Sequence, residues 1–281
     1  MQIETNIKGV KIGDKYIPKI LGVINLSKES FYKQSITTDT DTVLKKVEMF
    51  LEEGVHFIDI GARSTAPGVK PISIKEELNK LLPPLKAVLD NFRVPISVDT
   101  QYSKIAEKAL TLGASIINDV SGFRTDPDIM KVIVEHDAHA IIMASKKVPG
   151  DCLGIKSIKE ELQKSINDIE TLGLNSNNLI IDPGIGRWIP SKVYGYNLEI
   201  INELQELRPL NKSILVAISR KSFIGDILNY PDPKNRLIGT IASTSIAVYN
   251  GAHIIRAHDV KETKEAIEIS WKIKNYKNYI S

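Results

Sequence analysis

Apolar residues alternate along the chain between short continuous runs and longer stretches with helical spacing. The short runs are rich in β-branched residues, which is typical of strands buried on both faces of a parallel sheet. The sequence predicts strands over 20–24, 57–60, 95–98, 115–117, 138–143, 179–181, 214–218 and 252–255.

The stretches between these runs carry the start and stop signals of helices. Ser103 is the expected cap of a helix that stops at Gly113, and the helix expected over 40–53 has the same pair of signals. Ser73 and Glu76 have the spacing of a capping box and open a third helix. Further helices are predicted roughly over 126–135, 157–172, 191–207, 237–249 and 260–276.

This alternation indicates one fold class. Eight strand–helix units in 281 residues predict an α/β protein of the (β/α)8 TIM-barrel type. An open doubly wound sheet is the alternative, but no glycine-rich dinucleotide motif follows the first strand. Residues 3–17 predict a β-hairpin that turns at Gly13-Asp14 and lies under the barrel as a lid. We expect a single domain over 1–281, with the hairpin in 1–18 and the barrel in 19–281.

Composition narrows the class of protein without naming a function. Lys and Arg number 37 against 34 Asp and Glu, and no dense basic run carries aromatic residues, so no nucleic-acid partner is expected. The single cysteine, Cys152, excludes an internal disulfide framework. No stretch is apolar enough to span a membrane or to form a signal peptide, so we expect a cytoplasmic protein.

Seven of the eight predicted strands end in a polar or charged residue. Because the strands of a parallel barrel end at one mouth, these side chains are expected to meet there. Asp99, Asn118 and Asp182 offer the carboxylate and amide edges that suit a flat heterocycle with paired N–H groups. Asp59 and Asp119 can equally be structural carboxylates, because Asp after a strand is often a turn former or a cap. A cationic, hydroxyl-rich set suits an anion such as phosphate: Thr65, Ser219, Lys221, Ser222, Arg256 and His258.

Seven segments in order along the chain resemble the motif set of dihydropteroate synthases. They are GVINLSKESF (22–31), DIGARSTAPG (59–68), SVDT (97–100), INDVSG (117–122), DPGIG (182–186), SRKSFIG (219–225) and RAHDV (256–260). The resemblance covers nearly the whole chain from about residue 18. It implies a transferase that joins 7,8-dihydropterin-6-ylmethyl diphosphate to an arylamine, forms a C–N bond and releases pyrophosphate. It also implies a homodimer and small-molecule substrates.

The resemblance further implies a role for individual side chains. The residues expected at the pterin are Asp99, Asn118, Met143, Asp182 and Lys221, of which Asp99, Asp182 and Lys221 are the expected catalytic groups. The residues expected at the diphosphate are Asn25, Thr65, Arg256 and His258, with Asn25 also holding Mg²⁺. The residues expected near the arylamine are Ser222, Arg63 and Arg187.

The sequence departs from the family pattern around the amine rather than around the pterin. Arg63 stands where the family usually has Glu, and Ala66 stands where it usually has Arg. Arg187 and Trp188 follow DPGIG in place of Phe-Gly. Drift in loop residues is one explanation. The other is that Arg63, Arg187 and Lys28 add positive charge for an acceptor with its own anion, such as the ribosyl-phosphate aniline of methanopterin biosynthesis.

Two other functions stay open from the sequence. A pterin-dependent methyltransferase uses a similar heterocycle-binding set, but it has no need of a pyrophosphate site. A pterin-binding barrel without catalysis is consistent with Ala66 and the altered first loop, although the residues expected at the diphosphate are retained.

Overall fold

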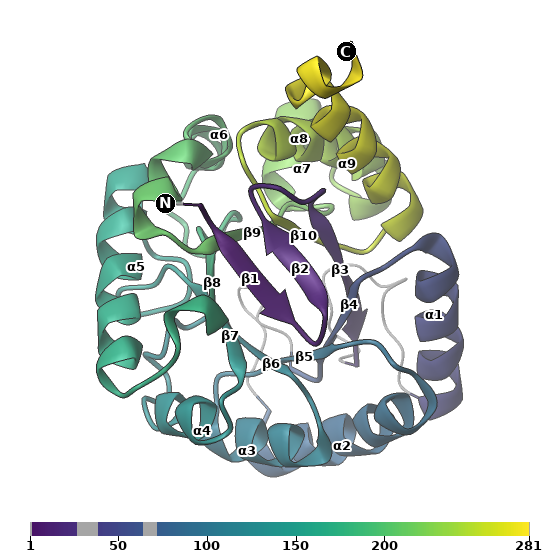
Figure 1. Ribbon diagram of the computed structural model, residues 1–281, viewed down its shortest axis with the longest axis vertical. Coiled ribbons are helices and arrows are strands. Elements are labelled where there is room, and N and C mark those ends of the chain that lie inside the picture. The colour runs from purple at the N-terminus through teal and green to yellow at the C-terminus, as the bar shows by residue number, and fades with distance from the viewer. Residues whose placement is uncertain (1, 27–38, 64–71, 281) are drawn as a thin grey trace.

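The computed structural model describes residues 2–26, 39–63 and 72–280. Eight parallel strands form a closed barrel in the order β10-β3-β4-β5-β6-β7-β8-β9, and helices surround it (Figure 1). The strands are β3 (Lys19–Asn25), β4 (Phe57–Gly61), β5 (Ile96–Asp99), β6 (Ile116–Asp119), β7 (His139–Met143), β8 (Leu179–Asp182), β9 (Ser213–Ala217) and β10 (Ile254–Ala257). Each predicted strand overlaps an observed one, so the predicted (β/α)8 barrel is confirmed.

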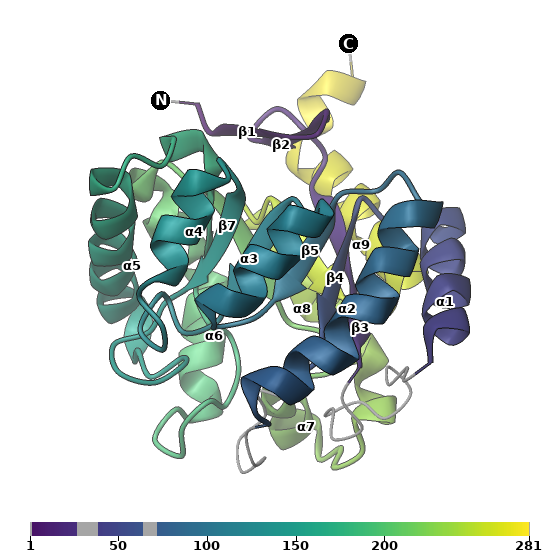
Figure 2. The ribbon, with the colours of Figure 1, turned by 90° about the horizontal axis from the view of Figure 1, so that it is seen from below.

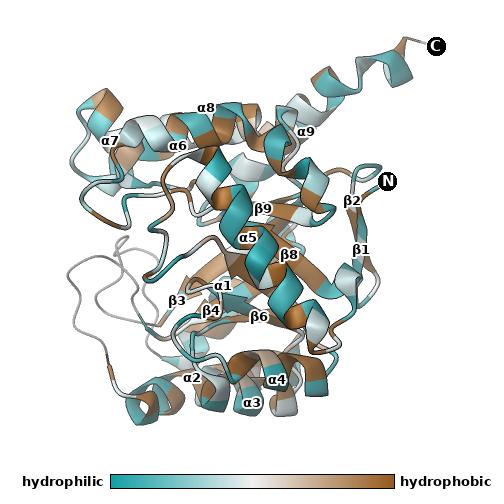
Figure 3. Cartoon of the chain, turned by 90° about the vertical axis from the view of Figure 1, so that its left-hand side faces the viewer, coloured by the Kyte–Doolittle hydropathy of each residue, from teal (hydrophilic) through white to brown (hydrophobic). Residues whose placement is uncertain are grey.

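The helices pack apolar faces against the outside of the barrel, and their outward faces are mixed: many are polar, whereas Ile238, Ile246 and Ile269 are exposed (Figure 3). They are α1 (Thr40–Glu53), α2 (Ile74–Asn91), α3 (Ser103–Leu112), α4 (Ile129–Glu135), α5 (Gly154–Thr171), α6 (Tyr194–Asn202), α7 (Ser222–Leu228), α8 (Leu237–Tyr249) and α9 (Val260–Lys274). Short 3-10 turns are η2 (Ser176–Asn178), η3 (Leu204–Leu210), η4 (Pro233–Arg236) and η5 (Tyr276–Tyr279). No helix in the described part of the chain is long and apolar enough to cross a membrane.

The helix ends follow the sequence signals in part. Helix α1 ends at Gly54 as expected, but its cap is Asp39 rather than a residue of 40–42: the Asp39 carboxylate accepts the backbone N–H of Thr42 at 3.1 Å. Ser73 and Glu76 form the expected capping box at the start of α2. Ser103, in contrast, is not the cap of α3, and the residue before it makes no side-chain cap bond. The backbone N–H and the hydroxyl of Ser103 donate instead to Asp126 Oδ2, at 2.8 and 2.7 Å. A carboxylate from the loop after β6 therefore satisfies the start of α3.

The interior of the barrel has its own apolar cluster, separate from the larger one between strands and helices. Its members are Ile7, Ile12, Leu21, Phe57, Ile116, Ile141, Ile180, Leu215, Ala217 and Ile254. Ile7 and Ile12 come from the N-terminal hairpin, which lies across the amino end of the barrel (Figure 2). The hairpin thus closes this end of the barrel interior, as predicted, and the polar strand ends lie at the opposite mouth.

The hairpin turns at a different place from the one predicted. Strands β1 (Glu4–Ile7) and β2 (Val10–Gly13) pair with Ile7 opposite Val10, so the turn is Lys8-Gly9. Both turn residues have positive φ, 46° and 89°, as a two-residue type I′ turn requires. The prediction of a turn at Gly13-Asp14 was wrong, because the chain leaves the hairpin there.

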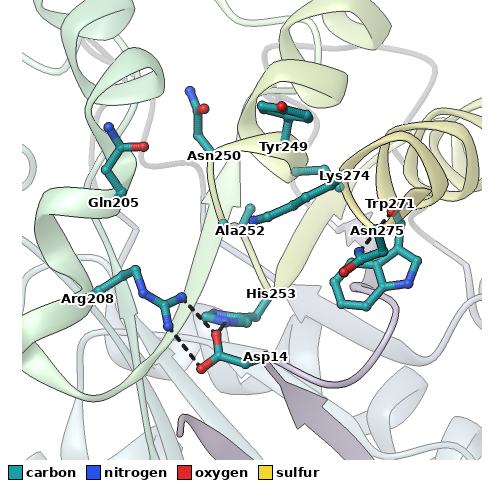
Figure 4. Close-up of a pocket in the computed structure, with 12 residues that line it drawn as sticks. Asp14, Gln205, Arg208, Tyr249, Asn250, Ala252, His253, Trp271, Lys274 and Asn275 are labelled. Carbon is teal, nitrogen blue, oxygen red and sulfur yellow. Dashed lines mark hydrogen bonds and ion pairs between the residues drawn. The ribbon is translucent and has the colours of Figure 1, made fainter. Parts of the chain in front are cut away.

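Asp14 anchors the hairpin to the barrel. Its carboxylate accepts two hydrogen bonds from Arg208, at 2.8 and 3.0 Å, and lies 3.2 Å from Nε2 of His253 (Figure 4). His253 Nδ1 accepts from the backbone N–H of Ile214, so the ring proton is on Nε2 and is donated to Asp14. A cavity of about 450 Å³ borders this group. It lies at the amino end of the barrel, away from the polar strand ends.

Candidate active site

Strand register brings the predicted polar residues together at the carboxyl end of the barrel. Gly61 pairs with Asp99, and Asp99 pairs with Asn118 on the next strand. Met143 pairs with Asp182 in the same way. A Cβ atom at Gly61 would lie 3.2 Å from Cβ of Asp99, so a glycine at this position leaves room for the carboxylate.

Arg256 joins two carboxylates at the centre of this mouth. It donates from Nε to Asp59 Oδ2 at 2.7 Å, and its Nη2 lies 2.6 Å from the same oxygen and 2.9 Å from Asp99 Oδ2. Asn118 adds a weaker bond to Asp59 Oδ2 at 3.3 Å. Burial raises the pKa of Asp99 and the Arg256 charge opposes that rise. The guanidinium expected at the diphosphate is therefore held among the residues expected at the pterin.

Asp182 and Lys221 form the other half of the mouth. Asp182 Oδ1 accepts the backbone N–H of Gly184 at 2.7 Å. Lys221 donates from Nζ to the carbonyl oxygen of Ile185. Burial raises the pKa of Asp182 and lowers that of Lys221 to about 8, while the attraction between the two charges opposes both shifts. Both groups therefore keep their charges at neutral pH more readily than burial alone would allow.

A polar group at the ends of β9 and β10 lies next to Lys221. Ser219 Oγ is 3.0 Å from Nδ1 of His258. Burial and the charge of Arg256 lower the pKa of His258 to about 3, so this ring is neutral at physiological pH. Arg220 makes two 2.8 Å bonds to the carboxylate of Asp259. This pair links the β9 and β10 loops, and the sequence pattern does not predict it because the two residues are 39 positions apart.

Arg63 has a different environment from the one expected at an arylamine pocket. Its Nε donates to Glu77 Oε2 at 2.8 Å, and its Nη1 donates to the Tyr102 hydroxyl at 3.1 Å. Its Nη2 donates to the carbonyl oxygen of Ile72. Thr100 donates to the other oxygen of Glu77, which is 1% exposed. The positive charge of Arg63 is thus balanced by a buried carboxylate of α2.

The remaining predicted residues fall at the rim or outside the described chain. Arg187 is exposed, and Ser222 is the first residue of α7, directly after Lys221. Thr65 and Lys28 lie outside the described residues.

The side chains at the mouth indicate what kind of metal site is available there. Within residues 2–26, 39–63 and 72–280, no three His, Cys, Asp or Glu side chains lie together as metal ligands would. Asn25, half-buried at the end of β3, offers an amide oxygen. Mg²⁺ commonly takes one or two protein oxygens and completes its shell with water and substrate phosphates. This donor set fits a Mg²⁺ ion that arrives with a diphosphate.

Comparison with known proteins agrees with this architecture. Residues 21–258 match the family described as pterin binding enzyme. The dihydropteroate synthase of Clostridium beijerinckii is 35% identical over 252 residues, which are 89% of this chain and 92% of that protein.

Two solved structures superpose closely on the whole barrel. The Yersinia pestis dihydropteroate synthase with a sulfonamide drug has a TM-score of 0.88 at 30% identity, covering 98% of this chain and 100% of that one. The Coxiella burnetii enzyme in complex with pteroic acid has a TM-score of 0.87 at 34% identity, covering 98% and 99%. The chain therefore belongs to the dihydropteroate synthase family of pterin-binding enzymes, which are transferases that form a C–N bond.

Proposed function

We propose that this protein condenses 7,8-dihydropterin-6-ylmethyl diphosphate with p-aminobenzoate and releases pyrophosphate. The observation that carries the proposal is the pair of largely buried carboxylates, Asp99 and Asp182, which share one mouth with Asn118 and Lys221. Carboxylate oxygens can accept paired N–H bonds from a pterin edge. The relative from Coxiella burnetii supports this assignment, since pteroic acid is a pterin joined through a methylene group to p-aminobenzoate.

The reaction breaks the C–O bond between the pterin methylene and the diphosphate and forms a C–N bond to the amine. Positive charge develops on the pterin and negative charge on the leaving group. Asp99 and Asp182 stabilise the pterin cation, and their low-polarity surroundings strengthen that effect. Lys221, whose pKa of about 8 leaves it mainly protonated at neutral pH, acts as a hydrogen-bond donor rather than a base. After attack the amine nitrogen loses one proton to solvent, so the products are the C–N adduct, pyrophosphate and that proton.

The leaving diphosphate is assigned to the side of the mouth that carries Asn25 and His258. A neutral His258 donates a hydrogen bond without adding charge. Asn25 would hold Mg²⁺, which neutralises charge on the departing pyrophosphate when it is bound. Cys152 takes no part as a nucleophile, since it is buried and burial raises the pKa of its thiol to about 11.

The balanced charge of Arg63 favours p-aminobenzoate as the acceptor. An amine with a further phosphate needs cations in excess of those that bind one carboxylate. Of the three cations expected to supply that excess, Arg63 is paired with Glu77 and Arg187 is exposed. The exposed guanidinium of Arg187 is the observation that keeps a ribosyl-phosphate aniline as the second candidate acceptor.

We also propose that the protein forms a homodimer through α8 and α9. Large apolar side chains are exposed along these two helices and η5: Ile238, Ile246, Tyr249, Ile269, Ile273, Tyr276 and Tyr279. Apolar patches of this kind commonly mark an interface. Light scattering after size-exclusion chromatography should give twice the mass of the chain for the wild type and a monomer for Ile246→Lys.

Pyrophosphate release tests the proposed reaction. The purified protein is supplied with Mg²⁺ and the pterin diphosphate, together with p-aminobenzoate, a ribosyl-phosphate aniline or no amine. We expect turnover with p-aminobenzoate, its loss with EDTA and its return with added Mg²⁺. Asp182→Asn should lower kcat/KM strongly, while Asp128→Asn, at an exposed residue, is the matched control. Pterin binding without turnover with either amine would contradict the proposal and favour a binding protein.

A further inference from the structure

We propose that Trp188 is a positioning residue of this active site, whose indole face holds the Lys221 ammonium group where it can meet both substrates. This inference rests on the proposed function, because that function places Lys221 between the pterin and the amine. Trp188 itself stands in a segment that departs from the family pattern, so this contact is a property of the present chain.

The contact is visible in the geometry around the lysine. Nζ of Lys221 lies 5.4 Å from the centre of the Trp188 ring, within the range of a cation–π interaction. The same nitrogen donates to the carbonyl oxygen of Ile185. Burial and the charges of Arg256 and Lys192 lower the pKa of Lys221, and the charges of Asp182 and Asp99 raise it. The ammonium group is thus bounded by a carbonyl oxygen, a carboxylate and an aromatic face.

Two glycines seat the indole ring in this position. A Cβ atom at Gly150 would lie 2.2 Å from Cγ of Trp188, so the ring is pressed against the backbone of the β7 loop. A Cβ atom at Gly186 would lie 3.1 Å from Nε1 of Trp188 and 3.4 Å from Nζ of Lys221. A side chain at Gly150 would displace the ring, and one at Gly186 would crowd the ring.

A buried lysine links the two loops that contain Gly150 and Gly184. Lys192 is fully buried and donates from Nζ to the carbonyl oxygens of Gly184, at 2.8 Å, and Gly150, at 3.2 Å. Lys192, four residues after Trp188, therefore joins the β7 loop to the β8 loop. Nε1 of Trp188 is buried and has no hydrogen-bond partner among the described residues, so no hydrogen bond of its own fixes the orientation of the indole ring.

The charge of Lys221 makes this contact measurable. Burial disfavours the ammonium form and lowers the pKa to about 8, whereas an aromatic face favours the ammonium form. Loss of the ring should therefore lower the pKa of Lys221 further, by about one pH unit for a desolvated contact. The protonated fraction of Lys221 then falls about eightfold near pH 8.5.

The first test is the pH dependence of kcat/KM for the pterin diphosphate at saturating p-aminobenzoate. In Trp188→Leu we expect the alkaline limb to move down by about one pH unit. In Trp188→Phe, which keeps an aromatic face, the limb should stay within about 0.3 units of wild type. A residue with only a structural role would lower activity at every pH without moving this limb.

The second test needs no turnover. The chain has two tryptophans, and Trp271 lies at the amino end of the barrel beside the cavity of Figure 4. In Trp271→Phe, Trp188 is the sole indole, and its emission should titrate as the neighbouring Lys221 loses its proton. Adding Lys221→Met should abolish that titration, and circular dichroism shows whether each variant is folded.

The outcomes separate this inference from the proposed function. The proposal fails if Trp188→Leu keeps the wild-type alkaline limb, or if Trp188 emission shows no titration that depends on Lys221. If the wild type does not turn over, the proposed function fails, and the emission titration still decides whether the contact exists. Trp271→Phe should retain the wild-type pH profile, since that residue is remote from the mouth.

Discussion

Replacing Arg256 with methionine leaves two carboxylates in the barrel without the cation that they share. In the wild type, Arg256 contacts Asp59 at 2.6 and 2.7 Å and Asp99 at 2.9 Å, and Asp59 is completely buried. Removing one partner of a buried ion pair typically costs about 3–5 kcal/mol, because the remaining charge is neither hydrated nor compensated. We expect the free energy of unfolding of R256M to fall by about that amount at pH 8.

The loss of stability caused by R256M should depend on pH, and it should be larger at higher pH. Arg256 opposes the rise that burial causes in the pKa of Asp99, so its loss moves that pKa further above the ordinary value of 3.8. A raised pKa in the folded state means that the folded protein binds a proton which the unfolded chain releases. Stability is then lost as the pH rises, by up to about 1.4 kcal/mol per pH unit for one group. The penalty should therefore be smaller at pH 5 than at pH 8.

Urea unfolding followed by circular dichroism measures this effect. The set is wild type, R256M, Asp59→Asn and the double variant, each at about pH 5 and about pH 8. In the Asp59→Asn background, the R256M penalty should shrink by at least about 1 kcal/mol, because one of the stranded charges is gone. The reasoning is refuted if R256M is as stable as wild type at pH 8, or if its penalty grows as the pH is lowered.

Three further changes test other parts of the structure. Arg63→Met strands buried Glu77 and should lower the free energy of unfolding in urea by about 3 kcal/mol; a changed KM for the amine at unaltered stability would contradict the pairing. His56 has a pKa that burial lowers from 6.5 to about 4, so only the unfolded chain takes up this proton between those values, and stability falls as the pH falls. His56→Asn should flatten that slope in urea unfolding, and an unchanged slope would exclude His56 as its source. Gly22→Ala brings a Cβ to 2.7 Å from the Phe50 ring and should cost about 1–3 kcal/mol, seen as a lower thermal midpoint, whereas an unchanged midpoint would show that the site has room.

The sequence by itself determined the architecture and the position of the mouth. The strands and helices follow from side-chain periodicity, and the end of α1 at Gly54 follows from the backbone preference of glycine. Both are properties of residues that are neighbours in the sequence. The order of strands then follows from the parallel barrel topology. Asp99, Asn118 and Asp182 lie at the same mouth because each is the last or the second-last residue of a strand, which a sequence pattern can show. Their roles at the pterin stay predictions.

The tertiary structure decided which charges face one another. Arg63 lies against Glu77, 14 positions away, and Arg256 lies against Asp59, 197 positions away. The sequence supplied each charge but not its partner, so it left Arg63 open for an arylamine. A long charged side chain can reach several positions. The position of lowest free energy is the one in which its charge is paired with a buried opposite charge. That choice depends on residues which only the closed barrel brings within a few ångströms.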